Sequence, residues 1–367
     1  MDPSLSNIIN DETTFKFTLS NINVSLANAL RRTIINDIPT TVFHTEVYED
    51  KQCIIHTNTS RLHNEILKHR LSCIPIHITD LEILPENYVL DIDVENDTDT
   101  MKYVTTEDFR IRNKNTDNYL TRNETMKIFP PCSRTNMYID FARLRPKIGN
   151  TIPGEKLKLS AEFSVNSANE NSMFNVVSTC SYGNTIDSVK AKTVWEDHEN
   201  KIRADGLTAD ELEIQKRNFY LLDAQRYYKE DSFDYIIQSV GVYENKDIVK
   251  KACEVLHKKL TDLVNSIDSD MVMIKLSETN MDFSYDIVLE NEDYTIGKVL
   301  EYILYEKFFI DQKRLTFCGF KKLHPHDTDS IIRVAYAEVT DKGLVADNLK
   351  DVCIVAAEVF TKLHKMF

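Results

Sequence analysis

The chain has 367 residues, 42% of them hydrophobic and 28% charged, a balance typical of a globular protein with two or three domains. The longest apolar runs hold only a handful of residues, whereas a membrane helix needs about 20, so no membrane partner is expected. With 58 acidic and 44 basic residues the formal net charge is −14, and basic residues occur at most as doublets. A surface that grips nucleic acid must neutralise several phosphates, so any work near DNA would fall to partners. The alternative is that the charge serves only solubility.

The N-terminal residues carry neither the basic stretch nor the apolar stretch of a secretory signal, and the seven cysteines are dispersed. This pattern predicts reduced thiols in a cytosol-like compartment. A structural zinc site is not expected, because no two cysteines stand close enough to form a ligand pair.

Apolar residues at helical spacing predict four long helices. They cover about 25–37, 246–267, 295–308 and 347–365. Ser25 precedes the first apolar turn and is predicted to cap that helix.

About 200 residues separate the first helix from the second, too many for a simple connection. Alternating apolar residues at 89–94 and 156–163 predict strands of an inserted β-rich domain. The polar stretch 97–127 is expected to be rich in loops. The stretch 196–217 is expected to be a charged surface excursion, helical in part.

Two segments of the chain align without a gap when the sequence is shifted by 270 residues. Each has an alternating strand, then a turn with an Asn, then a capped helix with a small residue in its first turn. The aligned pairs are Phe15–Tyr285, Phe17–Ile287, Leu19–Leu289, Asn21–Asn291, Ser25–Thr295, Leu26–Ile296, Ala27–Gly297, Leu30–Leu300 and Ile34–Leu304. Farther along, 252–256 resembles 356–360 within a long helix. Two matches of the same type indicate a duplicated unit.

A strand-turn-helix unit with a wide apolar stripe has more surface to bury than its own small sheet can cover. Two copies in one chain are therefore expected to pair helix against helix as a pseudo-dimer. The expected seam is Leu26, Leu30, Ile34, Ile296, Gly297, Leu300 and Leu304. Small residues at Ala27 and Gly297 would let the helices approach closely. The alternative is two ordinary α+β domains whose helices cover only their own sheets.

Two motifs resemble ligand sites and fail on inspection. The segment 149–156 resembles a phosphate-binding loop, but Glu155 stands where the Lys should be and a strand pattern follows it, so a turn is predicted. The segment 324–327, His-Pro-His-Asp, lacks a distant third metal ligand and is predicted to be a turn between strands. No nucleophile–base pair or magnesium-binding carboxylate cluster is apparent.

Arg31 and Arg32 follow Leu30 directly, so they flank the buried stripe of the first helix. Arginine at an interface edge offers several planar donors to a partner's carbonyls or carboxylates. The alternative is a solvated helix face.

At this point the residues resemble a known family. The run VSLANALRRT at 24–33, followed by IPT at 38–40, resembles the signature helix of RNA polymerase alpha-type subunits, namely bacterial alpha, archaeal D and the eukaryotic third-largest subunit. NEILKHRL at 64–71, followed by IPI at 74–76, is similar to the family's next block. FDYIIQSVG at 233–241 resembles the strand that re-enters the family's dimerisation domain.

The C-terminal part resembles the short partner of these subunits, archaeal L or the eukaryotic eleventh subunit. NEDYTIGKVL at 291–300 is similar to its hallmark, with Tyr294 and Lys298 in place of the usual His and Asn. CGFKKLHP at 318–325 resembles its His-Pro turn. The two partners in one chain are a form found in large cytoplasmic DNA viruses, so the resemblance implies a viral origin.

The resemblance implies an α+β fold in which an alpha-type dimerisation domain is interrupted by a β-rich insert and completed by a C-terminal L-like domain, as an intrachain pseudo-dimer. The expected domains are 1–45 and 186–268 for the two parts of the dimerisation domain, 46–185 for the insert and 269–367 for the L-like domain. The Cys-rich metal element of some relatives is missing, and no bacterial-type DNA-binding domain follows, so neither a metal nor a cofactor is expected.

The implied function is a non-catalytic assembly platform of a multisubunit DNA-directed RNA polymerase. It would dock the two large catalytic subunits and small assembly subunits, reach DNA only through the complex, and not form homo-oligomers. Its expected location is the cytoplasm or a virion. The expected docking residues are Asn28, Arg31, Arg32, Glu65, His69 and Arg70. A free-standing interaction scaffold and an enzyme without a visible signature are the alternatives.

Overall fold

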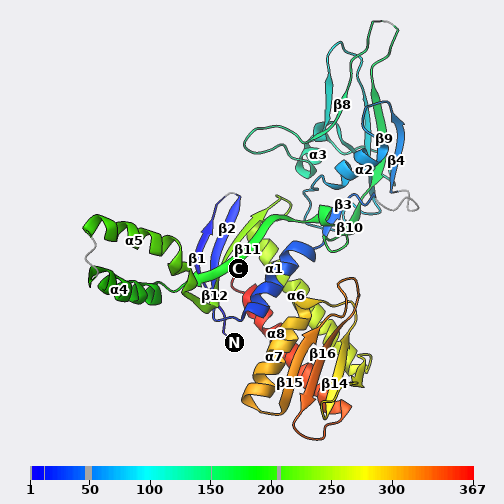
Figure 1. Cartoon of the computed structure of the whole chain (residues 1–367). Helices are drawn as coiled ribbons and strands as arrows, with labels where there is room; N and C mark the ends of the chain where they lie inside the picture. Colours follow the sequence, from blue (N-terminus) through cyan, green and yellow to red (C-terminus); the bar gives the residue numbers. More distant parts are fainter. Residues whose placement is uncertain (1, 12, 46–51, 150, 205–207) are drawn as a thin grey trace. The chain divides into compact units, whose positions relative to one another are not determined.

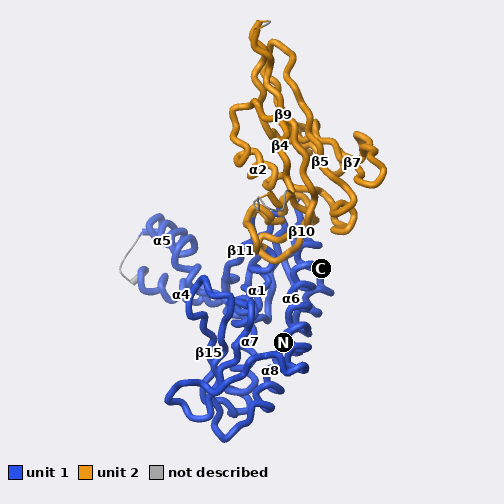
Figure 2. The backbone as a smooth tube through the Cα atoms, turned by 90° about the vertical axis from the view of Figure 1, so that its right-hand side faces the viewer, with its two compact units in different colours: residues 1–34, 179–238, 245–367 blue, residues 35–178, 239–244 orange. Residues whose placement is uncertain are grey.

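The computed structural model describes most of the chain and divides into two compact units, shown in Figure 2. Unit 1 combines three separate segments of sequence, and unit 2 combines two. The described residues are 2–11, 13–45, 52–149, 151–204 and 208–367. Unit 1 is 1–34, 179–238 and 245–367, and unit 2 is 35–178 and 239–244. The predicted start of the insert, at residue 46, lies outside the described residues.

The first sheet of unit 1 has four strands in the order β1-β2-β12-β11 (Figure 1). The strands are β1 (Ser4–Asn10), β2 (Thr14–Ser20), β11 (Val177–Ile186) and β12 (Tyr228–Ser239). The alternating side chains of β2 explain its place in the sheet, because Phe15, Phe17 and Leu19 are all buried. The Phe17 ring stacks on Tyr235 of β12, with 4.9 Å between ring centroids.

Helix α1 (Val24–Asn36) is tied to this sheet by a hydrogen bond. The hydroxyl of Tyr235 donates to the carbonyl of Ala27 at 2.6 Å, and burial raises the pKa of Tyr235 well above its usual value. Asn23, rather than the expected Ser25, caps the start of the helix. Its side-chain oxygen accepts a hydrogen bond from the backbone N–H of Ser25 at 2.8 Å.

The second sheet of unit 1 has the order β13-β14-β16-β15, and its neighbouring strands are antiparallel. Helix α7 (Tyr294–Leu304) follows β14 and continues into a π-helical turn η4 (Tyr305–Asp311). The strands are β13 (Ile274–Leu276), β14 (Ser284–Leu289), β15 (Leu315–Lys321) and β16 (Ser330–Tyr336).

The repeat seen in the sequence has a counterpart in the elements. Asn21 and Asn291, which align at the 270-residue shift, both adopt left-handed backbone, with φ of 61° and 55°. Asp293 caps α7 from the position that corresponds to Asn23, since its carboxylate accepts from the backbone N–H of Thr295 at 2.8 Å. The expected cap, Thr295, is therefore inside the helix.

The two longest helices of unit 1, α6 (Asn245–Asp268) and α8 (Lys342–His364), pack side by side. They run antiparallel, because Glu254 in the first half of α6 bonds His364 at the end of α8, at 3.1 Å, whereas Asp268 at the end of α6 accepts from Lys350 in the first half of α8. Within the same unit, α4 (Ser188–Ala204) and α5 (Ala209–Leu221) form a helical hairpin around Trp195 and Phe219. The excursion predicted at 196–217 is thus longer and more helical than expected, and its residues 205–207 lie outside the described ones.

Unit 2 is built on a four-stranded antiparallel sheet of order β4-β9-β5-β7, whose inner side chains form one large apolar core. Its strands are β4 (Cys53–Asn58), β5 (Tyr88–Glu95), β7 (Arg110–Asn113) and β9 (Lys156–Glu162), with the smaller pairs β6 (Lys102–Thr105) with β8 (Asp140–Leu144), and β3 (Thr40–Val42) with β10 (Ser164–Asn166). Its helices are α2 (Asn64–Ser72) and α3 (Arg122–Ile128), with the 3-10 turns η1 (Thr106–Asp108) and η2 (Ser172–Phe174).

The prediction that 97–127 is rich in loops holds only in part, since 97–101 and 114–121 lie outside the helices and strands. This stretch contains β6, η1, β7 and most of α3. These elements are only three to seven residues long, too short to display a period, and local capping stabilises them. At α3, Thr121 and Glu124 form a reciprocal capping box.

Candidate functional site

Arg32 of α1 reaches the N-terminus of α7, which lies more than 260 residues later in the chain. Its Nε donates to the hydroxyl of Thr295 at 2.9 Å, and its Nη2 pairs with the carboxylate of Asp293. Burial alone would raise the pKa of Asp293, but the bonds from Thr295 and the charge of Arg32 outweigh it and lower that pKa. The guanidinium therefore joins the two repeated helices.

Arg31, the neighbouring residue, lies against a different set of groups. Its Nε donates to the side-chain oxygen of Asn28, one turn earlier, at 3.0 Å. Burial raises the pKa of Cys180 on β11 to about 12, and the charge of Arg31 opposes this rise. Arg31 and Asn28 are both half-buried, so part of each side chain still faces solvent.

Helix α2 of unit 2 carries the other three residues expected to dock a partner. Arg70 uses its guanidinium within the unit, since its Nη2 donates to the carbonyl of Asp140 at 2.6 Å and its Nε to that of Phe141 at 2.8 Å. Glu65 and His69 are exposed, and among the described residues neither side chain has a hydrogen-bond or ion-pair partner. These two side chains are available to another molecule.

The seven residues of the expected seam are all buried in unit 1. Gly297, however, makes room for a side chain and not for a second helix. A Cβ at this position would lie 2.0 Å from the Phe320 ring on β15. The expectation that Gly297 lets two helix backbones approach was therefore wrong, because the ring fills that space.

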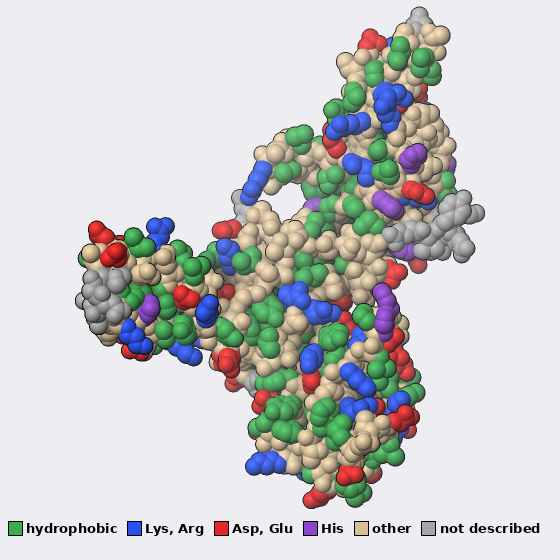
Figure 3. Space-filling model, viewed as in Figure 1, with side chains coloured by type: hydrophobic (Ala, Val, Ile, Leu, Met, Phe, Trp, Pro, Cys, Tyr) green, Lys and Arg blue, Asp and Glu red, His purple; other side chains and the backbone are tan. Residues whose placement is uncertain are grey.

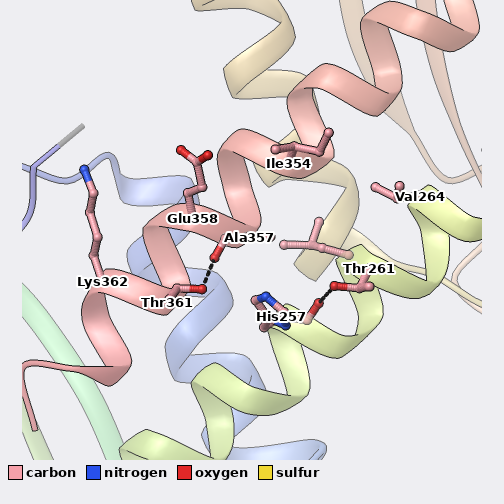
Figure 4. Close-up of a pocket in the computed structure, with 9 residues that line it drawn as sticks. His257, Thr261, Val264, Ile354, Ala357, Glu358, Thr361 and Lys362 are labelled. Carbon is pink, nitrogen blue, oxygen red and sulfur yellow. Dashed lines mark hydrogen bonds between the residues drawn. The ribbon is translucent and has the colours of Figure 1, made fainter.

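The main helix pair that sequence reasoning left out of the seam is α6 with α8. The resemblance of 252–256 to 356–360 was the available signal, since these segments lie on the two packed helices. A shallow groove of about 390 Å³ runs along their junction, and Figure 4 shows the residues that line it. Thr261 and Thr361 both turn their hydroxyls back to their own helices, onto His257 and Ala357 respectively, which leaves a largely apolar groove.

The nearest approach to a catalytic arrangement is a chain of three side chains on the sheet of unit 2. The Ser160 hydroxyl donates to Asp91 at 2.7 Å, and His56 Nε2 lies 3.2 Å from the same hydroxyl. A serine nucleophile needs its proton taken by a histidine that a carboxylate orients. Here the serine lies between the other two side chains, and its hydroxyl donates a hydrogen bond to Asp91. The histidine is therefore not oriented by the carboxylate, and the arrangement does not activate the serine as a nucleophile.

The two segments that resembled ligand sites are turns in the part of the chain that the structure describes. Gly149 has φ of 58°, and Ile148 pairs with Ile152 across the turn, while Asn150 lies outside the described residues. In the His-Pro segment, the backbone N–H of His324 donates to Asp327 at 2.9 Å. No group of three metal-ligating side chains occurs among the described residues.

On the face drawn in Figure 3, acidic and basic side chains are interspersed over both units. Within the described ranges, no helix combines the length and apolar character that crossing a bilayer requires.

Comparison with known proteins decides the family. Residues 16–260 match the RNA polymerase Rpb3/Rpb11 dimerisation domain. The chain belongs to this family. The match contains α1, α2 and the first two thirds of α6, and it ends before the second sheet of unit 1.

Three relatives illustrate the range of similarity. The DNA-directed RNA polymerase subunit Rpo3 of Pyrococcus furiosus is 46% identical over 66 residues, which is 18% of this chain and 22% of that protein. The human DNA-directed RNA polymerases I and III subunit RPAC1 is 36% identical over 67 residues, which is 18% of this chain and 17% of that protein. A conjugation stage-specific protein of Tetrahymena thermophila is 33% identical over 118 residues, which is 28% of this chain and 35% of that protein. The chain thus spans no more than about a third of the length of these curated relatives.

Proposed function

We propose that this chain is a non-catalytic assembly subunit of a multisubunit DNA-directed RNA polymerase, with an Rpb3-like and an Rpb11-like part joined in one polypeptide. The observation that carries the proposal is the pairing of repeated elements within unit 1 of a member of the Rpb3/Rpb11 family. Arg32 links α1 to the capped end of α7, and α6 packs along α8. In this proposal the pairing partner that a separate subunit would supply is already present in the chain.

The proposed seam consists of the buried apolar residues of α1 and α7, together with the α6–α8 pair. Because both halves are in one chain, no seam is left for a second copy, and we expect a monomer in the absence of partners. Native mass spectrometry of the purified chain would test this. A stable homodimer at micromolar concentration would contradict it.

The proposed docking toward the second-largest subunit uses the expected residues of α1 in unit 1 and of α2 in unit 2. Glu65 and His69 support it most directly, because they are exposed and unpaired among the described residues. Arg31 adds a half-buried guanidinium, and at an interface such a group forms several hydrogen bonds at once. Arg32 and Arg70 serve docking mainly by bracing their own helices, since their guanidiniums bond within the chain.

Co-purification with the two large subunits tests the docking assignment. Glu65→Ala combined with His69→Ala should leave the melting temperature unchanged and lower recovery of the large subunits, as should Arg31→Ala. The matched control is Glu213→Ala with Arg217→Ala, an exposed acidic and basic pair on α5 with the same spacing. Full recovery with both docking variants would refute the assignment.

The alternative is a free-standing interaction scaffold with the same fold, which would purify from its source without polymerase subunits. The exposed Glu65 and His69 are compatible with either function. The composition of the native complex therefore distinguishes a polymerase subunit from a free-standing scaffold. In the polymerase reading, DNA is contacted only through the complex, in keeping with the net charge of −14. A fused form of this kind further suggests a viral polymerase working in the cytoplasm or carried in a virion.

A further inference from the structure

Unit 2 contains a hollow of about 500 Å³ whose lining includes no residue of α2. Its walls come from the end of β5, η1, β7 and α3. Its floor is apolar, with the buried rings of Phe109 and Phe129 packed edge to face at 5.2 Å. This volume falls in the range of sites that enclose a drug-sized group or a few side chains.

Most of the charged groups around the hollow are already paired within the chain. Glu107 pairs with Arg122, and Asp108 accepts from the backbone N–H of Thr105 at 2.9 Å. Asp93 pairs with Lys158, also at 2.9 Å. Arg110 is exposed, and among the described residues its side chain has no hydrogen-bond or ion-pair partner. Arg110 is therefore the guanidinium at the rim of the hollow that can pair with a carboxylate of a ligand.

A second polar group is unpaired at the same place. Thr125 of α3 is only 7% exposed, lines the hollow, and has no side-chain hydrogen bond to any described residue. Its hydroxyl is therefore free to bond an acceptor on a ligand in the hollow. Beside it, Met126 is 43% exposed, a flexible apolar side chain that can adapt to an incoming group.

We propose that this hollow binds a segment of a partner protein that carries one bulky apolar side chain next to a carboxylate. The apolar side chain enters over Phe109 and Phe129, and the carboxylate pairs with Arg110. A protein segment suits the site because exposed Tyr119 and Met126 form its wall, and aromatic and Met side chains are enriched at the anchor points of protein interfaces. The site uses none of the docking residues of α1 and α2, so its partner is a further one.

Fluorescence anisotropy with the full chain tests the proposal. The probe is a labelled twelve-residue peptide, about that long so that its ends clear the site, with one Trp flanked by Glu in an otherwise Gly/Ser sequence. We expect this peptide to bind, and Arg110→Glu to weaken binding by about tenfold or more, because the single pairing charge becomes repulsive. Met126→Asp should weaken it to a similar degree by charging the apolar wall.

The controls separate this site from general attraction. A peptide with Lys in place of each Glu, and a peptide with Ala in place of Trp, should both bind at least about tenfold more weakly. Arg134→Glu, an exposed charge reversal elsewhere in unit 2, should leave binding unchanged. The proposal is overturned if the Glu/Trp peptide does not bind at millimolar concentration, if the Lys peptide binds equally well, or if Arg110→Glu and Arg134→Glu have equal effects. All three variants change exposed side chains, and an unchanged melting curve confirms that they fold.

Discussion

Arg32 on α1 pairs with Asp293, and the same carboxylate caps α7 through the backbone N–H of Thr295. The carboxylate of Asp293 therefore caps one repeated helix, α7, and forms an ion pair with a side chain of the other, α1. Because the partners are 27% and 37% exposed, solvent weakens the pair, and its net contribution to stability is moderate.

Replacing Arg32 by Ala should lower the free energy of unfolding by about 1–2 kcal/mol, since it removes the ion pair and the bond to Thr295. Thermal unfolding followed by circular dichroism measures the change. Arg226→Ala, which breaks an ion pair whose Arg is 81% exposed, should change stability by less than about 0.5 kcal/mol. Equal effects of the two variants would show that Arg32 does not hold α1 to α7.

The pair of Asp286 and Arg333 predicts a dependence of stability on pH. Both oxygens of Asp286 accept from the guanidinium, at 2.6 and 2.7 Å, and this bonding lowers the pKa of Asp286 below its usual 3.8. The stabilisation is complete above the unfolded pKa of about 4 and is lost as pH falls through the lower folded value, because the unfolded chain takes up the proton first.

Asp286→Asn should therefore cost about 2–3 kcal/mol at pH 7, and the cost should shrink between pH 4 and pH 2. Urea unfolding midpoints of the parent chain and the variant at pH 7, 4 and 3 provide the measurement. A cost that stays constant over this range would mean that the carboxylate does not titrate with a lowered pKa.

Gly297→Ala should destabilise unit 1 even though alanine favours helices, because the added Cβ would meet the Phe320 ring. We expect a loss of about 1–3 kcal/mol, the range for overpacked cores, and partial recovery when Phe320→Leu is added. Gly343→Ala is the matched control on α8, where the nearest atom lies at 3.7 Å, and it should raise the melting temperature. A stabilising Gly297→Ala would contradict the packing described.

Leu30→Asp should unfold or aggregate the chain, because Leu30 is fully buried in α1 and the substitution places an unpaired charge there. The expected loss exceeds about 4 kcal/mol. Val24→Asp on the same helix should be tolerated, since Val24 is 47% exposed and lies in the first turn, where a negative charge is favourable. A cooperative, unshifted melting curve for Leu30→Asp would remove Leu30 from the seam.

The long elements could be predicted from the sequence because their burial is periodic. Helices were expected at 25–37 and 246–267, and α1 and α6 begin and end within two residues of those limits. Both caps were misplaced by two residues. Asn23 and Asp293 each cap from a position just before the hydroxyl residue that was expected to do so, and a spacing pattern alone does not choose between them.

The partners of individual polar groups could not be predicted, because they depend on which elements meet. Arg31, Arg32 and Arg70 looked equivalent in the sequence, yet Arg31 bonds to its own helix while the other two bond to distant elements. The hollow beside Arg110 had no signal, since apart from the end of β5 its walls come from short elements that show no period. The 270-residue repeat and the likeness of 252–256 to 356–360 did point to contacts between distant segments.

The two ends of the helical hairpin α4–α5 are held together where they leave the sheet. Strands β11 and β12 are neighbours, and the backbone N–H of Asp187 donates to the carbonyl of Tyr227 at 2.9 Å where the hairpin departs. The two ends of the excursion are thus already held at the spacing of a short turn. The α4–α5 hairpin can therefore be shortened, lengthened or replaced by another module. The sheet that carries it should fold as before.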